Sequence, residues 1–357
     1  AQADGSWRIH PDRLESAQLP LTVDEAVEAR IAALAPAERK LLEGAATVGS
    51  VFWLGALVAM GRLDRRAPEI WGGSDELRPH FEDVLDSLVG RDYVLEMPDS
   101  TIAQDREFAF KHNLERERIQ KLSSAAAVRR NHRLLAHWLE YRLLDRGEEQ
   151  LEMLASHYER GGDARKAAHY YIGSGDRARA RYANDKAIEL YDQGLALLGD
   201  DDATTRMEAL HNQGDVLALA GRNDEALEAF RKMLELEKDF QIVGEAQDGR
   251  QAVALVKKHQ PEVVLMDIAM PLLNGLEATR QILKVHPASK VLILSAHSDD
   301  AYVTTSIEAG AVGFLLKQTS SHDVCGAIRE VAKGKQFFSP TISRRMARMS
   351  SHTPNRP

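Results

Sequence analysis

The run Val263-Val-Leu-Met266 constrains the fold of this chain more than any other stretch. Its consecutive apolar residues predict a strand buried on both faces, the pattern of a parallel sheet that is covered by helices. The run ends at Asp267, and Pro271 with Gly275 predicts a turn just beyond it. Open parallel sheets place their ligand chemistry at the carboxyl ends of their strands. The next helical pattern starts at 276, too late for Asp267 to be its N-cap, which favours a functional role for this carboxylate.

Two further apolar runs also end in polar side chains. Lys290-Val-Leu-Ile-Leu-Ser295 ends in a hydroxyl, and Gly313-Phe-Leu-Leu-Lys317 ends in an amine. In a parallel sheet, the three strand ends would present a carboxylate, a hydroxyl and an ammonium group at one edge.

These stretches resemble the receiver domain of two-component response regulators, particularly the class that carries a LuxR-type helix-turn-helix. The resemblance covers about residues 240 to 340, and it is carried by Val243-Gly-Glu-Ala-Gln-Asp-Gly249, the MDIAMPLLNG stretch, the LSAHSDD stretch and Gly310-Ala-Val-Gly-Phe-Leu-Leu-Lys317. It implies a doubly wound parallel α/β fold of the flavodoxin-like type. It also implies that Asp267 is the phosphoacceptor, that Ser295 and Lys317 contact the phosphoryl group, and that Phe314 is the switch aromatic.

The metal site departs from the receiver pattern. Receivers hold Mg²⁺ with the phosphoacceptor and an acidic pair from the end of their first strand, because this hard cation needs several oxygen ligands. Extending the resemblance backwards without gaps puts that pair on Gly221-Arg222, and neither residue can ligate Mg²⁺. The remaining ligands would be Asp267 and a main-chain carbonyl near Ala269. We therefore predict weak Mg²⁺ affinity and slow or absent phosphorylation.

Residues 216–240 allow two interpretations. Val216-Leu-Ala-Leu-Ala220 lies where a receiver would have its first strand, and residues 225–240 lie where it would have its first helix. The same residues also form two helical patterns, 207–219 and 224–236. Five residues that are mostly Ala and Leu are poor strand formers, so we favour the helices. The receiver-like part would then lack the strand that sits between its second and third strands, leaving four strands or imperfect closure.

Before residue 148 the patterns are mainly helical. Helices are predicted over 21–34, 36–46, 52–60 and 77–89, followed by a strand candidate at 92–96 and a charged helix pair over 108–141. This arrangement looks like a winged helix. The region resembles the part behind the nucleotide-binding core of large signal-transducing ATPases, through Leu19-Pro-Leu-Thr22, Glu28-Ala-Arg-Ile-Ala-Ala-Leu34, Ala45-Ala-Thr-Val-Gly49 and Glu107-Phe-Ala-Phe-Lys-His-Asn-Leu114. The sequence holds no Gly-x-x-x-x-Gly-Lys-Ser/Thr motif, which excludes that type of phosphate cradle.

Between residues 148 and 239 polar turns alternate with Ala-containing helical patterns. The turns at Gly162-Asp163, Asn184-Asp185 and Asn223-Asp224 resemble those of tetratricopeptide repeats, although their spacing is irregular. Stacked helix pairs of this kind usually present a concave protein-binding surface. A structural spacer is the alternative.

Composition excludes several functional classes. A formal net charge of −8 gives no broad basic surface, so we expect no direct nucleic-acid binding. The single cysteine, Cys325, excludes an intramolecular disulfide, and the sequence has no apolar run of membrane-spanning length. We expect a cytoplasmic protein with no membrane partner and, since Ala1 is not Met, one cut from a longer chain. The histidines at 112, 132, 137 and 157 lack partners at metal spacing, so we predict no zinc.

The predicted organisation follows the chain in order. It comprises an extended segment (1–20), a winged-helix-like domain (21–98), a helical connector (99–147), tetratricopeptide-like repeats (148–239), a receiver-like domain (240–340) and a disordered tail (341–357). The leading function is phosphorelay signal transduction without enzymatic activity, with a histidine kinase or other signalling proteins as partners and output through protein contacts. The alternatives are a non-phosphorylated interaction scaffold with a degenerate receiver and a fragment of a transcription regulator.

Overall fold

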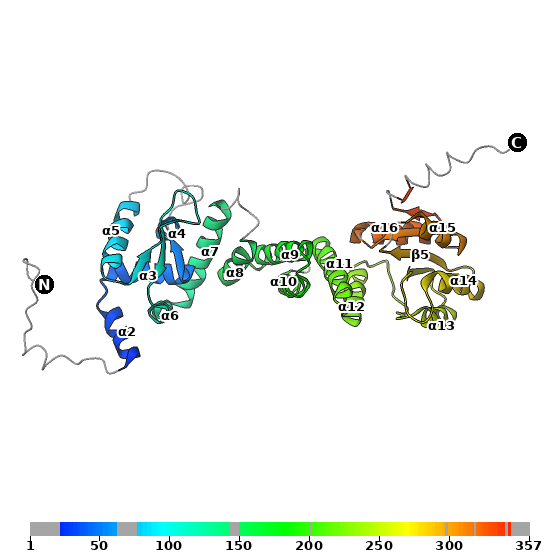
Figure 1. The fold of residues 1–357 in the computed structure, drawn as a ribbon, viewed down its shortest axis with the longest axis horizontal. Helices are drawn as coiled ribbons and strands as arrows, with labels where there is room; N and C mark the ends of the chain where they lie inside the picture. The colour runs from blue at the N-terminus through cyan, green and yellow to red at the C-terminus, as the bar shows by residue number, and fades with distance from the viewer. Residues whose placement is uncertain are drawn as a thin grey trace, which may run out of the picture. The chain divides into compact units, whose positions relative to one another are not determined.

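The computed structural model describes residues 22–62, 77–142, 150–199, 201–296, 299–317, 319–339 and 342–343. The chain divides into two compact units, Ala1–Ala167 and Ala168–Pro357 (Figure 1). The expected extended segment 1–20, and the expected disordered tail 341–357 apart from residues 342 and 343, lie outside the described residues.

The first unit packs helices around a small antiparallel sheet with the strand order β1-β3-β2. Its strands are β1 (Val51–Trp53), β2 (Val94–Glu96) and β3 (Glu107–Phe110). Its helices are α2 (Val23–Ala32), α3 (Pro36–Val48), α4 (Leu54–Gly61), α5 (Leu77–Gly90), α6 (Asn113–Leu122), α7 (Ala125–Arg142) and α8 (Leu151–Gly161). One apolar core joins α3, α5 and the strands.

Two of the helical predictions in this unit are wrong at their first residues. Residues 51–53 and 107–110 are strands, whereas the patterns predicted helices from 52 and from 108. Phe52 and Phe108 face each other across the β1–β3 pair, with ring centroids 5.7 Å apart, and both are fully buried. Such cross-strand aromatic pairs stabilise a sheet, and their partner lies too far along the chain to appear in a local pattern.

Four consecutive helices follow, the first of which crosses the boundary between the two units. The helices are α9 (Ala164–Ala180), α10 (Asn184–Leu197), α11 (Ala203–Leu219) and α12 (Asn223–Glu235). Small residues allow close approach between them: a Cβ added at Gly214 would lie 2.7 Å from the ring of Phe230. Gly221 adopts a φ of 77° in the turn between α11 and α12, where glycine is favoured. The helical interpretation of residues 216–220 is thus confirmed.

We predict that enlarging a buried alanine in the core shared by α9 to α12 destabilises it. Ala187 and Ala226 are 0% and 4% exposed, so Ala187→Leu or Ala226→Leu should overpack the core and lower the free energy of unfolding by about 1 to 3 kcal/mol. Ala218→Leu, on the exposed side of α11, is the matched control. Urea-dependent hydrogen exchange of peptides from residues 184–235 measures the change. Unchanged stability in both core variants would contradict close packing.

The remainder of the second unit is an α/β domain with a parallel sheet of order β4-β5-β6-β7. The strands are β4 (Val263–Asp267), β5 (Lys290–Ser295), β6 (Gly313–Leu316) and β7 (Phe337–Phe338). The helices are α13 (Gly249–His259), α14 (Gly275–Val285), α15 (Asp300–Glu308) and α16 (Ser321–Ala332). One core contains residues of α13, α14 and α15, and a second contains residues of α16. The sequence predicted an all-α half followed by a parallel α/β half. The fold class is confirmed as a mostly helical region, which also contains the three-stranded sheet of the first unit, followed by a parallel four-stranded α/β domain.

Strand β4 lies at an edge of the sheet. Within the described ranges it pairs with β5 alone, and residues 241–246 form no strand. Leu265 is 37% exposed, so the prediction that β4 is buried on both faces is wrong for this residue. The reason is topological, because residues 216–220, which could have supplied a neighbouring strand, belong to α11 and its C-terminal end.

Candidate functional site

The side chains predicted to act together lie at the carboxyl ends of neighbouring strands. Asp267 ends β4, Ser295 ends β5, and Lys317 directly follows β6. The register pairs Asp267 with Leu294 and Ser295 with Leu316, so the three ends meet at one edge of the sheet. This is the edge at which open α/β sheets bind their ligands.

Asp267 and Lys317 form a direct ion pair. Lys317 Nζ lies 2.6 Å from Asp267 Oδ2, while Asp267 Oδ1 accepts a hydrogen bond from the Ala269 N–H at 3.0 Å. Both side chains are about one-third exposed, at 31% for Asp267 and 36% for Lys317. Solvent therefore limits the stability gained from the pair to about 1 kcal/mol or less. The carboxylate stays accessible to a reagent from solvent.

Gly275 permits the turn beneath Asp267. A Cβ at this position would lie 1.9 Å from the main-chain oxygen of Asp267, so no other residue fits without moving the loop. The Gly275 N–H donates to the oxygen of Ile268 at 3.0 Å. Asn274 caps α14, since its side chain accepts from the Glu277 N–H at 2.9 Å. Asn274, and not Asp267, is therefore the N-cap of α14. This agrees with the expectation that Asp267 does not cap the helix.

Ser295 and Phe314 lie deeper in the domain. Ser295 is 1% exposed, and its main-chain oxygen accepts from the Lys317 N–H at 2.8 Å. Phe314 is fully buried in the core that α13 and α14 cover. The hydrogen bond from the Lys317 N–H to the Ser295 oxygen fixes the main chain at Lys317. Strand β5, which ends at Ser295, therefore helps to position the Lys317 amine.

The loop after Asp267 contains one feature that the sequence did not signal. Leu272 adopts a φ of 62°, a left-handed conformation that is unusual for a residue with a branched side chain, and it is 77% exposed. A leucine gives no local indication of such a turn. The backbone strain at Leu272 therefore lies in the loop between Asp267 and α14, next to the candidate site.

The acidic pair of a receiver's metal site is not assembled in this structure. Gly221 and Arg222 lie in the turn between α11 and α12, where Arg222 Nη2 pairs with Glu225 Oε2 at 2.5 Å. Among the described residues, no group of three His, Cys, Asp or Glu side chains is placed to hold a metal ion. At the sheet edge Asp267 and a carbonyl near Ala269 are a poor set for Mg²⁺, which requires near-octahedral oxygen coordination.

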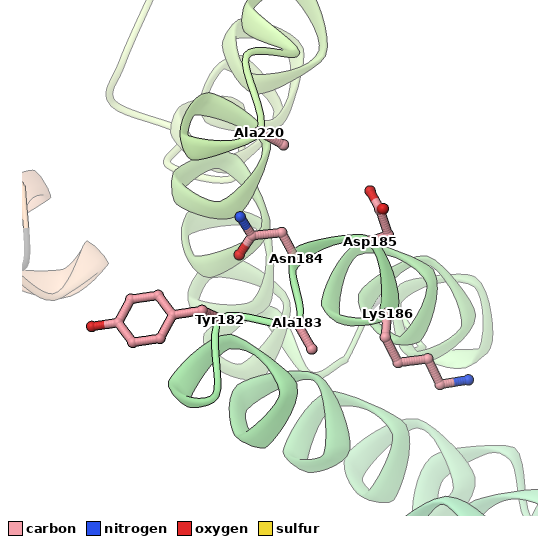
Figure 2. A pocket seen from close by; sticks show the side chains of 6 residues that line it. All are labelled: Tyr182, Ala183, Asn184, Asp185, Lys186 and Ala220. Carbon is pink, nitrogen blue, oxygen red and sulfur yellow. The ribbon is translucent and has the colours of Figure 1, made fainter.

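A hollow lies among the helices α9, α10 and α11. It has a volume of about 510 Å³ and is lined by Tyr182, Ala183, Asn184, Asp185, Lys186 and Ala220. Figure 2 shows Tyr182 projecting away from the helices, with Asp185 and Lys186 on the first turn of α10. Tyr182 is 84% exposed and has a φ of 58°. Its open, polar lining is more suited to a peptide than to an enclosed small molecule.

Comparison with known proteins assigns one part of the chain. Residues 218–329 match the response regulator receiver domain. The chain is 41% identical over 116 residues to the transcriptional regulatory protein DegU of Brevibacillus brevis, which covers 32% of this chain and 49% of DegU. It is 36% identical over 116 residues to the response regulator GacA of Pseudomonas aeruginosa, which covers 32% of this chain and 54% of GacA. The chain thus spans about half the length of these relatives.

The solved structures that are similar are also response regulators. A two-component response regulator of the LuxR family from an Aurantimonas species is 30% identical, with a TM-score of 0.34, and covers 35% of this chain and 89% of that one. By the family match and the curated relatives, residues 218–329 are a response regulator receiver domain. The chain carries the receiver of a two-component response regulator, and the residues before 218 are unassigned.

Receiver domains are in general non-enzymatic signalling domains, they work with a kinase partner, and they typically bind Mg²⁺ for phosphorylation. The matched range begins within α11 and includes α12. In the part of the chain that the structure describes, no helix is both long enough and apolar enough to cross a bilayer.

Proposed function

We propose that Asp267 accepts a phosphoryl group from a histidine kinase and that the chain passes this signal on through protein contacts. The observation that carries the proposal is the 2.6 Å pair between Asp267 and Lys317 at the carboxyl edge of a parallel sheet. A carboxylate at this place can attack phosphorus, forming a P–O bond while the bond between phosphorus and the donor nitrogen breaks. Lys317 provides a positive charge for the phosphoryl oxygens, and Ser295 a hydroxyl donor.

We further propose that this phosphorylation is slow. The residues present do not fit a Mg²⁺ site of the receiver type, since Gly221 and Arg222 replace its acidic pair and lie in a repeat turn. Lys317 alone must then neutralise the charge at the reaction centre. Phe314 is proposed as the switch aromatic, whose buried position would change with the state of Asp267.

Acetyl phosphate tests this proposal. With Mg²⁺ present, intact mass should show a slowly growing adduct of about 80 Da, one phosphoryl group, that depends little on Mg²⁺ and is absent from Asp267→Asn. Asp323→Asn, an exposed carboxylate of the same domain, is the matched control and should keep the adduct. The complete absence of an adduct from the wild-type chain would overturn phosphorylation.

A non-phosphorylated interaction scaffold is the second candidate. Two observations favour it. Gly221 and Arg222 stand where a receiver has its acidic pair, and Arg222 pairs with Glu225, so these positions provide no Mg²⁺ ligands. The open hollow beside Tyr182 offers a surface for a protein segment. We propose that residues 148–239 act as tetratricopeptide-like repeats that bind protein segments. We also propose that residues 21–98 form a winged-helix-like domain whose function is structural. This region combines helices with strands of the three-stranded sheet. A third candidate is that the chain is a fragment of a transcription regulator, since a relative such as DegU is named as one.

A further inference from the structure

Helix α11 packs against α16 within the second unit. Two polar side chains of α11, His211 and Asp215, lie one helical turn apart, and His211 Nε2 is 3.8 Å from Asp215 Oδ2. A main-chain hydrogen bond joins the His211 ring to Thr319. Thr319 lies between Lys317, which follows β6, and Ser321, where α16 begins. Helix α11 therefore contacts the segment that carries the amine of the candidate site.

Asp215 lies among basic groups. Its side chain is 20% exposed, and Arg179 Nη1 lies 4.0 Å from Oδ2. Burial raises the pKa of Asp215. Three basic groups oppose this rise, namely His211, Arg179 and Lys317. Lys317 thus acts on two carboxylates, on Asp267 through a direct pair at 2.6 Å and on Asp215 at longer range.

Two attachments join α16 to the helices before it, and they differ in their geometry. Arg329, in the last turn of α16, pairs with Glu237 at 2.6 Å and with Asp239 at 2.7 Å. Its guanidinium also lies 4.9 Å from the ring centroid of Phe240. Charge-assisted hydrogen bonds of this length are strong. At the start of α16, by contrast, the ion-pair distances of Asp215, 3.8 and 4.0 Å, are too long for hydrogen bonds.

The contact at the start of α16 also contains a buried nitrogen without a partner. His211 is 7% exposed, and among the described residues no group hydrogen-bonds to its Nδ1 atom. A buried polar atom that lacks a partner costs free energy. This contact is therefore the less stable of the two attachments, and a change of charge nearby can alter it.

We propose that the packing of α11 on α16 responds to the charge at Asp267, because Asp215 and Asp267 share the amine of Lys317. Removing the negative charge of Asp267 leaves Lys317 free to turn toward Asp215, which tightens the contact. Additional negative charge at Asp267 holds Lys317 away from Asp215, which loosens the contact. His211 and Asp215 are thus positioning residues, which act on Lys317 and the segment that follows it.

The coupling goes beyond the proposed phosphorylation, since it needs only a change of charge at Asp267. A phosphoryl group adds about one negative charge to that side chain and so supplies the loosening change. This use of the contact rests on the proposed function. The pairs of Arg329 with Glu237 and Asp239 keep a loosened α11 close to α16, so the contact can form again within the same chain.

Hydrogen exchange of peptides from residues 203–219 tests the coupling without a phosphoryl donor. Asp267→Asn should slow the exchange of α11 about threefold, and Lys317→Gln should speed it about threefold, as expected for partly exposed charges. Exposed charges elsewhere in the receiver provide the matched controls, so Glu308→Gln and Lys284→Gln should leave the exchange unchanged. Changes in the same direction for Asp267→Asn and Lys317→Gln, or no change in either, would overturn the proposal.

A second set of variants assigns the effect to Asp215. Asp215→Asn removes the charge and nearly keeps the shape of the side chain. In this background, Asp267→Asn and Lys317→Gln should no longer change the exchange of α11, because coupled sites are not additive. Effects that persist in full would show a structural role of Lys317 that does not involve Asp215, and would overturn the proposal. Since neither measurement uses acetyl phosphate, the coupling and the proposed phosphorylation stand or fail separately.

Discussion

Truncating Ile293 to alanine should lower the free energy of unfolding of the receiver by about 2 to 5 kcal/mol. Ile293 is fully buried at the centre of β5 and belongs to the core beneath α13 and α14. The deletion removes buried apolar surface and leaves a cavity that close-packed neighbours cannot fill. Urea-dependent hydrogen exchange of peptides from residues 290–316 measures the loss for this part of a multidomain chain.

Leu265→Ala provides the informative comparison. Because Leu265 keeps 37% of its surface exposed, its truncation should cost only about 1 kcal/mol. Lys257→Ala, on the exposed side of α13, should change stability by less than about 0.5 kcal/mol. Equal losses for Leu265 and Ile293 would contradict an open edge at β4 and would show that another element covers it.

Acidification should destabilise the first unit through a buried histidine pair. His132 on α7 and His157 on α8 are 2% and 6% exposed, and their Nδ1 atoms lie 2.9 Å apart. One ring therefore donates a hydrogen bond to the other, and the accepting ring must be neutral. Burial, with Arg160 nearby, lowers the pKa of His132 to about 4. Burial, His132 and Arg160 together lower the pKa of His157 to about 3.

The direction of the pH effect follows from these pKa values. Above the unfolded pKa of about 6.5 both states are neutral, and the pair contributes fully to stability. As the pH falls below this value the unfolded chain binds protons that the folded chain does not. The free energy of unfolding then decreases until the folded pKa values, about 4 and about 3, are reached. Between pH 7 and pH 5 the loss should be about 2 kcal/mol for each histidine.

Tryptophan fluorescence during urea unfolding suits this measurement. All tryptophans, at 7, 53, 71 and 138, belong to the first unit. The double variant His132→Leu/His157→Leu should show a smaller loss of stability between pH 7 and pH 5 than the wild-type chain. His80→Gln, an exposed histidine of the same unit, should keep the full loss. Equal pH dependence in the wild type and the double variant would contradict the role of the pair.

Much of the receiver could be predicted from local sequence. The runs 263–267, 290–295 and 313–316 form strands, as their apolar residues predict. Apolar runs bounded by turn residues carry this information within a few positions. The same reasoning placed Asp267, Ser295 and Lys317 at one edge, because parallel strands share the direction of their carboxyl ends.

Other features depend on partners that are distant along the chain. The strands at 51–53 and 107–110 carry helical patterns, and the pairing of Phe52 with Phe108 decides their conformation. His132 and His157 show no metal spacing in the sequence, and only the packing of α7 on α8 brings their rings together. Leu272 gives no sign of its left-handed backbone, which the turn beneath Asp267 imposes.

The sequence by itself determined that Asp267 ends a strand of a parallel sheet, because a short apolar run, an acidic end and a following Pro and Gly suffice for that inference. It did not determine the location of residues 216–220. Two Ala, two Leu and one Val have weak intrinsic preference between helix and strand, so burial decides. In the tertiary structure Val216 and Leu217 gain that burial against Ala226 and Ala229, and β4 is left at the edge of the sheet.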